Sequence, residues 1–504
     1  MKQIRMLSML TIIFLAACGP SSNSSSLGGT PSLQPPLCGN GICQIGETHA
    51  SCPSDCTSEP FEGIIETTTI NSEGIGNIAV MVASPQTARY SNGAGIVVVV
   101  PPVFSSVDGF MTDPDVTSLG LIQVSFLWPG KTDKASGLSS EGLFDFGGPQ
   151  SAQVIRDVIR YASARKPDID NRYVVTLTHV PPLTNEVGVY AFDDASIPVV
   201  NELSLADEQL QNLMYFIGRE NPSSDTLTCR ETGYINTSGV SVVNPFYLYS
   251  SSYTFSKISL NFSNLRWDAD YTDNRSTIPG RPFLDLDGNG TISSGDFIFD
   301  GQVPVMFGKR YYSVALTQAL LNNGALAMTD WPETLANPQE SSQEWNVLQN
   351  INNYANIKND EFLKDLKVML LFAQQDHIQV AADKPHIHQA FQGFRFEARL
   401  WVRLNPDRAY VQEILERSAD LQITVTPAIP ATPIAALEFP DNPANTQPTD
   451  WQEINSYAYP GQGDNARLIP LAAVAEMADR AHDDYWDENI GQALYYYPIA
   501  TPQP

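Results

Sequence analysis

The sequence predicts an α/β protein, because strand-like apolar runs alternate with a helical pattern along its central part. Residues 95–100 read Gly-Ile-Val-Val-Val-Val, and residues 366–372 form another largely apolar run. Runs of this kind are typical of strands that are buried on both faces of a parallel sheet. Between them, residues 149–165 carry apolar side chains at the spacing of an amphipathic helix.

Three further strand patterns extend this alternation, at residues 75–83, 119–127 and 187–192, and the last convincing strand covers residues 399–403. Strands that alternate with helices favour a mostly parallel sheet with helices on both faces. We therefore predict a main α/β domain at residues 61–420.

Length and charge limit the classes of function. The chain has 504 residues, enough for about two to four domains. Its hydrophobic share of 42% is that of a globular protein and not of a disordered chain. With 56 acidic against 29 basic residues, the net charge is −27. This balance, without any basic stripe in the sequence, excludes a general nucleic-acid-binding protein.

The C-terminal extension, residues 421–504, is expected to dock on the main domain. Residues 423–448 are rich in Pro, Ala and Thr and predict an extended segment. Residues 468–480 have the pattern of an amphipathic helix, and the aromatic residues Trp486 and Tyr495–Tyr497 are expected to hold it in place.

Residues 77–415 resemble the α/β-hydrolase superfamily. Ile96–Pro102 resembles the family's third strand and its oxyanion loop, and Leu119–Gly130 resembles the fourth strand. The sequence Gly-Val-Tyr-Ala-Phe-Asp-Asp-Ala at residues 188–195 is similar to the strand, sharp turn and helix that carry the nucleophile. The resemblance implies a hydrolase of the ester or peptide type, acting on a small molecule or a peptide.

The nucleophile position of this turn holds Asp193 in place of the usual serine. Ala191 and Ala195 supply the small side chains that so tight a turn requires two residues before and after the nucleophile. Three interpretations stay open. Asp193 attacks carbon, as in the epoxide hydrolases and haloalkane dehalogenases of the fold; the turn has lost its catalytic function; or the nucleophile is a serine elsewhere.

The resemblance also implies a triad acid after the strand at residues 366–372, where Asp376 follows in the sequence Gln-Gln-Asp-His. The family's catalytic histidine lies after the last strand, and this sequence has none there. His377, His386 and His388 follow the acid position closely, so any of them could enter the site. The candidate catalytic residues are therefore Asp193, Asp376, His377 and His388.

Two other interpretations of these histidines stay open. Each could be an ordered surface residue. His386 and His388 could also form half of a metal site with Asp383, although histidine pairs at this spacing are common by chance.

The clearest motif is in a segment, residues 203–305, that interrupts the sheet pattern where many hydrolases of the fold insert a cap. Residues 285–296 read Asp-Leu-Asp-Gly-Asn-Gly-Thr-Ile-Ser-Ser-Gly-Asp and match the EF-hand calcium loop, which the similar dockerin loops close with Asp. Calcium is the cofactor that this motif predicts. The expected ligands are the side chains of Asp285, Asp287, Asn289 and Asp296 and the backbone carbonyl of Thr291.

The flanks of this loop differ from those of an EF-hand. Pro279, Gly280 and Pro282 exclude a regular helix before it. We therefore expect a single calcium-stabilised loop. A second acidic cluster, Asp268, Asp270 and Asp273, could hold another ion or form a solvated surface.

The N-terminus predicts export. Residues 1–17 have the basic start and short apolar run of a signal peptide. They end in Leu-Ala-Ala before Cys18, which resembles the lipobox of bacterial lipoproteins. The resemblance implies acylation of Cys18 and attachment to a membrane, with Gly19 pointing to the outer membrane of a Gram-negative cell. An ordinary signal peptide that happens to end in Cys is the alternative.

A Ser/Gly/Pro-rich segment, residues 18–37, predicts a flexible stalk, and a Cys-rich module follows at residues 38–56. The module resembles the short CGNGxC…CPxDC unit of bacterial secreted proteins, which is similar to Notch-type repeats. In an exported chain, Cys38, Cys43, Cys52 and Cys56 imply two disulfides whose pairing the sequence leaves open. Asn40, Glu47 and Asp55 could bind calcium or form a solvated surface.

These observations leave three classes of function. The first is an exported, lipid-anchored hydrolase whose nucleophile position is altered. The second is a non-catalytic surface protein that binds a ligand on the same scaffold, and the third is a structural envelope lipoprotein. An imidazole paired with Asp193 would favour the enzyme, whereas a salt bridge to Asp193 would favour the binding protein.

Overall fold

The structure is a computed structural model of the chain. The described residues are 63–104, 109–205, 208–220, 226–236, 241–247, 260–273, 276–299, 303–342, 354–357, 363, 365–372, 385–417 and 465–486. The predicted signal peptide, stalk and Cys-rich module lie outside them, as do Asp376, His377 and Asp383.

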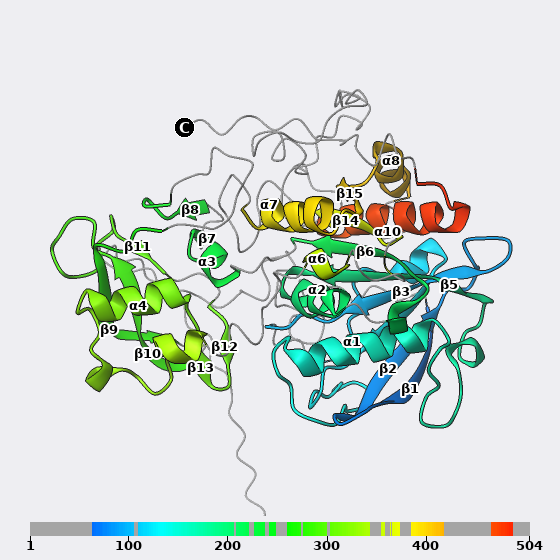
Figure 1. Cartoon of the computed structure of the whole chain (residues 1–504), viewed down its shortest axis with the longest axis horizontal. Coiled ribbons are helices and arrows are strands. Elements are labelled where there is room, and N and C mark those ends of the chain that lie inside the picture. The colour runs from blue at the N-terminus through cyan, green and yellow to red at the C-terminus, as the bar shows by residue number, and fades with distance from the viewer. Residues whose placement is uncertain are drawn as a thin grey trace, which may run out of the picture. The chain divides into compact units, whose positions relative to one another are not determined.

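The main domain is built on an eight-stranded sheet with the order β1-β2-β4-β3-β5-β6-β14-β15 (Figure 1). β2 is antiparallel to both of its neighbours, and all other pairs are parallel. This α/β-hydrolase-like sheet confirms the predicted fold class. The strands are β1 Ile64–Ser72, β2 Gly76–Ser84, β3 Ala94–Val100, β4 Ile122–Phe126, β5 Pro182–Phe192, β6 Leu213–Arg219, β14 Lys367–Leu371 and β15 Trp401–Leu404.

Helices cover both faces of this sheet, as Figure 1 shows for α1 and α10. α1 (Pro149–Ala162), α2 (Ser196–Ser204) and α7 (Pro385–Gln392) pack into the core on one face. α8 (Arg408–Glu416) and α10 (Asn465–Asp483) pack into the core on the other. The central strands are continuous apolar runs because both of their faces are covered.

Shorter elements complete the described part of the main domain. They are the 3-10 turns η1 Val116–Leu119, η2 Val174–Thr176, η3 Asp193–Ala195 and η4 Glu208–Leu210, and the π-helical turn η6 Gly393–Glu397. None of the helices in the described residues combines the length and apolar character needed to cross a membrane.

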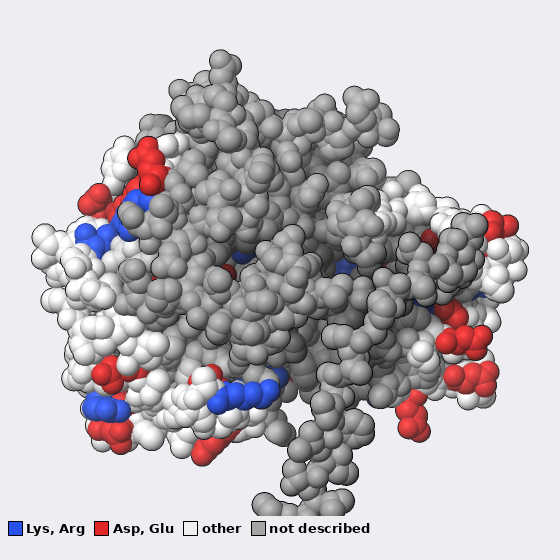
Figure 2. Space-filling view, turned by 180° about the vertical axis from the view of Figure 1, so that it is seen from behind, with Lys and Arg blue, Asp and Glu red and all other residues white. Residues whose placement is uncertain are grey.

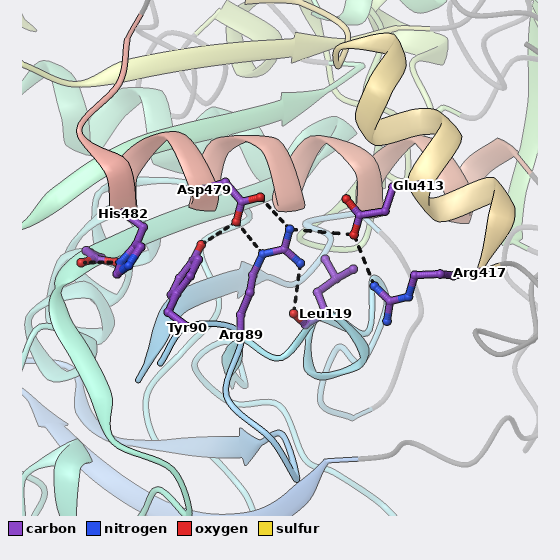
Figure 3. Close-up of polar contacts among 8 residues, drawn as sticks. Arg89, Tyr90, Leu119, Glu413, Arg417, Asp479 and His482 are labelled. Atoms are coloured by element: carbon purple, nitrogen blue, oxygen red, sulfur yellow. Dashed lines mark hydrogen bonds and ion pairs between the residues drawn. The ribbon is translucent and has the colours of Figure 1, made fainter. Parts of the chain in front are cut away.

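A polar cluster joins α10 to the loop between β2 and β3 (Figure 3). Arg89 donates to the Asp479 carboxylate from Nε at 2.6 Å and from Nη2 at 2.7 Å, and the Tyr90 hydroxyl donates to the same carboxylate at 2.9 Å. One turn later, His482 stacks on the Tyr90 ring with centroids 3.7 Å apart. These four residues form the α10 clamp. Burial raises the pKa of Tyr90, and the Asp479 charge raises it further, so its hydroxyl remains a donor.

A second, deeper ion-pair network ties α10 to β15. The carboxylate of Glu476 lies 3.2 Å from Arg403 Nε and 2.8 Å from Arg480 Nε, and Arg403 and Glu476 are both fully buried. Trp486 contacts Trp401 edge to face. α10 therefore docks through both apolar and buried ionic contacts, and the other expected anchors, Tyr495–Tyr497, lie outside the described residues.

The insertion lies between β6 and β14, at residues 220–366. Its sheet has the order β11-β10-β9, with β9 at Leu265–Asp273, β10 at Ser276–Leu284 and β11 at Phe297–Ile298. α4 (Val314–Asn322) packs on this sheet around a core that contains Leu284, Phe297 and Leu316. The remaining elements are α3 Thr226–Arg230, β7 Gly233–Ile235, β8 Ser241–Val243, β12 Val305–Met306, β13 Lys309–Arg310, η5 Met328–Asp330 and α6 Tyr354–Ile357.

The predicted range of the insertion, residues 203–305, differs from this one at both ends. It contains β6, which pairs with β5 and β14 in the main sheet. It also ends at the first residue of the hairpin of β12 and β13, and before α4. The apolar run of β6 is followed by the insertion and not by a crossover helix, so the strand–helix alternation that marked the other strands is missing there.

Charged side chains of both signs share the surface. On the face drawn in Figure 2, acidic and basic side chains of the described residues lie together on the left, whereas the described part on the right shows mainly acidic ones. The surplus of acidic residues, 56 against 29 over the whole sequence, gives the molecule its strong negative charge. Such a charge favours solubility and carries no information about fold.

Candidate functional site

The turn after β5 has the backbone conformation expected of a nucleophile turn. β5 ends at Phe192, η3 covers Asp193–Ala195, and α2 begins at the next residue. Asp193 has a φ of 49°, in the left-handed region that non-glycine residues rarely adopt. Ala191 and Ala195 are fully buried against the core on either side. The small residues thus permit a strained strand–turn–helix connection with Asp193 at its apex.

At one edge of the sheet, the two neighbouring strands β5 and β6 are each followed directly by a polar residue with a positive φ. Phe192 at the end of β5 pairs with Arg219 at the end of β6, so Asp193 and Glu220 follow adjacent positions. Glu220 has a φ of 47°. Asn405, directly after β15, has a φ of 58° and bonds through its side chain to the backbone of Phe372. Strained polar residues gathered at the carboxyl ends of parallel strands are typical of functional sites.

Arg230 holds the carboxylates at the turn. Its Nη2 lies 2.7 Å from Asp194 Oδ1 and 3.3 Å from Asp193 Oδ2, and all three residues are buried. The guanidinium carbon also lies 5.8 Å from the centre of the Phe104 ring, in the loop after β3. A guanidinium at this distance stabilises the charged carboxylate and weakens it as a nucleophile.

The next residue anchors Arg230 within the insertion. Ser313, the N-cap of α4, donates from its backbone nitrogen to Glu231 Oε1 at 2.7 Å and from its hydroxyl to Oε2 at 2.6 Å. These groups are buried. The end of α3 is therefore tied to α4 on one side and to the turn after β5 on the other.

A buried acid–imidazole pair lies at the same edge. His386 Nε2 is 3.3 Å from Glu220 Oε2, and both side chains are buried. Of the predicted histidines, His386 is thus placed against a carboxylate. His388 lies on α7, and its side chain is not among the described atoms. Glu220 was missed from the sequence, although its place directly after the apolar run at residues 213–219 could have revealed it.

The strand that leads to the turn carries a protonated phenol. Burial raises the pKa of Tyr190 on β5 to about 12, although the Arg219 charge opposes this rise. Arg219 itself stacks on the Phe192 ring at 4.3 Å. Tyr190 therefore remains neutral at physiological pH.

A small pocket lies beside Arg230 on the side of the insertion. Its walls are mostly apolar or aromatic, and Arg230 and Glu231 supply the charged groups. The lining residues are Leu227, Arg230, Glu231, Phe299, Val303, Pro304, Tyr311 and Tyr312. In this structure the pocket has room for little more than one water molecule, so a larger ligand could enter only if the pocket opened.

The predicted calcium loop brings its carboxylates together. Oxygens of Asp285, Asp287 and Asp296 lie within 4.8 Å of one another. Asp285 is only 3% exposed; its Oδ2 accepts from the Gly290 backbone at 3.0 Å, whereas its Oδ1 is buried without a hydrogen-bond partner in the part of the chain that the structure describes. Among the described residues, this buried oxygen has carboxylates nearby but no hydrogen-bond donor. Such an arrangement is typical of a site that binds a hard cation.

The other loop residues have local partners. Asn289 Oδ1 accepts from the Thr291 backbone at 2.7 Å, and Gly290 has a φ of 79° at the sharp turn. The loop connects β10 to β11, so a strand and not a helix precedes it. In the second acidic cluster, Asp268 pairs with Arg281 at 3.4 Å.

No protein-family model matches the chain, and no curated protein matches its sequence. Prolyl oligopeptidase B from Galerina marginata is a similar solved structure, with 11% identity, coverage of 72% of this chain and 36% of that chain, and a TM-score of 0.34. An acylaminoacyl peptidase from Pyrococcus horikoshii has 10% identity, coverage of 68% and 36%, and a TM-score of 0.33. A bacterial heroin esterase has 12% identity, coverage of 36% and 52%, and a TM-score of 0.26.

The chain thus spans between about a third and about half of the length of these structures. They are two peptidases and an esterase. The described sheet and the turn after β5 give this chain an α/β-hydrolase-like fold.

Proposed function

We propose that this protein is an exported, lipid-anchored binding protein built on an α/β-hydrolase-like scaffold. The observation that carries the proposal is the buried ion pair between Arg230 and the carboxylates of Asp193 and Asp194. A salt bridge at this position favours binding over catalysis, because the group that would attack a substrate is already held by a cation.

Two chemical arguments support this choice. Carboxylate attack on an ester or amide carbonyl gives a labile anhydride, so Asp193 is a poor replacement for serine in such a hydrolase. The pocket beside Arg230 also offers apolar walls with few polar groups, which suits a ligand held mainly by burial of apolar surface.

Turnover assays test the absence of ester or peptide hydrolysis. We expect the wild-type protein to release p-nitrophenol from p-nitrophenyl butyrate, or p-nitroaniline from a peptide anilide, no faster than Asp193→Asn. Wild-type turnover at least about tenfold above the variant, a difference of about 1.4 kcal/mol in activation free energy, would contradict the binding proposal.

Dye uptake tests the pocket directly. We expect the apolar dye Nile red to bind, and Val303→Asp, at a half-buried position of the wall, to weaken binding by about fivefold through loss of about 1 kcal/mol of apolar contact. Val305→Asp is the matched control, because Val305 is two residues away and 45% exposed. Equal affinity in the two variants would exclude this pocket as the binding site.

The Glu220–His386 pair favours a second candidate function. In a hydrolase of the epoxide or alkyl halide type, Asp193 would attack a substrate carbon, break its bond to oxygen or halide, and form an ester. An imidazole oriented by a carboxylate would then take a proton from the water that cleaves this ester. Styrene oxide and 1-bromobutane are suitable probes, and turnover that is lost in both Asp193→Asn and His386→Gln would favour this enzyme.

We also propose that the loop at residues 285–296 binds calcium and thereby stabilises the insertion. Asp285, Asp287, Asn289 and Asp296 would supply side-chain oxygens, and Thr291 its carbonyl. Leu284 and Phe297, which flank the loop, are paired in the strands and buried in the insertion core. An ion that fixes the loop would therefore also fix the two strands that enter this core.

Calcium is expected to raise the melting temperature by several degrees. At a concentration one hundred times the dissociation constant, an ion that binds only the folded state adds about 2.7 kcal/mol of stability. Asp287→Ala should abolish the response to calcium and to EDTA, while Asp270→Ala, at an exposed position of the neighbouring acidic cluster, should retain it. Differential scanning calorimetry at matched ionic strength measures both, and a wild-type melting temperature indifferent to EDTA would contradict the site.

Attachment to the membrane remains a proposal based on the lipobox-like sequence before Cys18. Palmitate labelling and recovery in the outer-membrane fraction are expected for the wild-type chain and not for Cys18→Ser. Equal recovery of the two proteins in the membrane fraction would argue for another mode of attachment.

A further inference from the structure

The hairpin of β12 and β13 has an unusual residue at its tip. Met306 pairs with Lys309, so Phe307 and Gly308 form a two-residue turn. Their φ angles are 50° and 77°, and turns with two positive φ angles favour Asn-Gly. A bulky aromatic residue in the left-handed region is a true outlier. Phe307 does not suit the turn, so we expect its ring to stabilise the structure through a contact elsewhere.

Phe307 contacts a second phenylalanine with the same strain. The ring centroids of Phe307 and Phe146 are 5.0 Å apart, with an interplanar angle of 70°, which is the edge-to-face arrangement that aromatic pairs prefer. Phe146, before the start of α1, has a φ of 54°. Two strained residues, one from the insertion and one from the main domain, thus converge on a single contact.

This contact adjoins the pocket beside Arg230. Phe146 and Phe104 both pack against a small buried cluster formed by Leu227, Met306, Tyr311 and Ala336. Leu227 and Tyr311 line the pocket. Leu227 belongs to α3, which also carries Arg230. Separation of Phe307 from Phe146 would therefore loosen the cluster that forms one wall of the pocket.

The contact is also weakly held. Phe307 is 53% exposed, so its ring gains only part of the stabilisation of a buried aromatic side chain. An edge-to-face pair of aromatic rings adds only a small stabilisation beyond the area that it buries, so separation of the two rings costs little. The closed and open arrangements of such a contact differ little in free energy.

We propose that the Phe307–Phe146 contact is a latch between the insertion and the main domain, and that its release admits an apolar ligand to the pocket beside Arg230. The latch itself follows from the contact and its strain. Only the admission of a ligand rests on the proposed binding function. An ordinary packing contact would instead stabilise the fold without controlling access.

Phe307→Asn separates these two roles, because asparagine suits the turn and removes the ring. Hydrogen exchange by mass spectrometry on the full chain is expected to show amide exchange at Thr226–Arg230 about fivefold faster than in the wild type, with a melting temperature within about 2 °C of it. Leu143→Asn is the control, since Leu143 is 80% exposed in the same loop as Phe146, and it should leave both quantities unchanged.

Unchanged exchange in α3 would overturn the latch. Faster exchange throughout the molecule with a clearly lower melting temperature would also overturn it, in favour of ordinary packing. The association rate of Nile red is then expected to rise about fivefold in Phe307→Asn, because a larger fraction of molecules is open. If the wild type fails to bind the dye, the binding proposal fails while the exchange result still decides the latch.

Discussion

Replacement of Arg230 by methionine is expected to lower the free energy of unfolding by about 3–5 kcal/mol, the usual loss when one partner is removed from a buried ion pair. The variant would leave Asp193 and Asp194 buried without the guanidinium that now contacts both. Urea unfolding monitored by circular dichroism measures the loss. Arg417→Met is the control, because the side chains of Arg417 and Glu413 are 38% and 40% exposed and their ion pair should contribute at most about 1 kcal/mol.

A triple variant extends this test. Asp193→Asn and Asp194→Asn remove the charges that Arg230 compensates, so their addition to Arg230→Met should recover part of the lost stability. If Arg230→Met alone costs less than about 1 kcal/mol, the ion pair does not hold the turn. Asp193 would then again be a candidate nucleophile, and the second candidate function would gain weight.

The second large effect is expected for Glu476→Gln, again about 3–5 kcal/mol. The substitution keeps the volume of the side chain but removes the negative charge that faces Arg403 and Arg480. Arg403 is fully buried, so water cannot replace the lost carboxylate. Glu413→Gln serves as the matched control, since its side chain lies beside the α10 clamp, is 40% exposed and should contribute less than about 1 kcal/mol (Figure 3).

The result of Glu476→Gln also tests how α10 is held. If thermal unfolding remains a single transition, the helix and the sheet unfold together. A loss below about 1 kcal/mol would instead mean that the α10 clamp and the apolar contacts suffice to dock the helix.

The sequence predicts the strands correctly where burial of both faces makes them continuously apolar. The strand at residues 95–100 is apolar at every position because helices cover both faces of the sheet. β1 was missed for the opposite reason, since it is an edge strand and Ile64, Ile65 and Glu66 are exposed. β6 was missed because a long insertion, and not a helix, follows its apolar run.

The candidate site could be predicted only in its local parts. The small residues around Asp193 identify the turn, and twelve consecutive residues contain the whole proposed calcium loop. Arg230 comes from 37 residues beyond Asp193, and His386 from 166 residues beyond Glu220. No local pattern distinguishes these partners from other charged residues, because their pairing depends on how the insertion and α7 pack.

The docking of α10 has a consequence for the order of folding. The Arg89–Asp479 contact joins residues 390 positions apart, and α10 covers apolar side chains of β3, β5, β6 and β14. During synthesis, β3, β5 and β6 are complete more than about 200 residues before the helix that shields one of their faces, and β14 is complete about 90 residues before it. The nascent chain therefore exposes this apolar face of the sheet until residue 483 has left the ribosome. A chaperone that binds apolar segments would be expected to bind this face. Contacts of such long range also slow the final folding step.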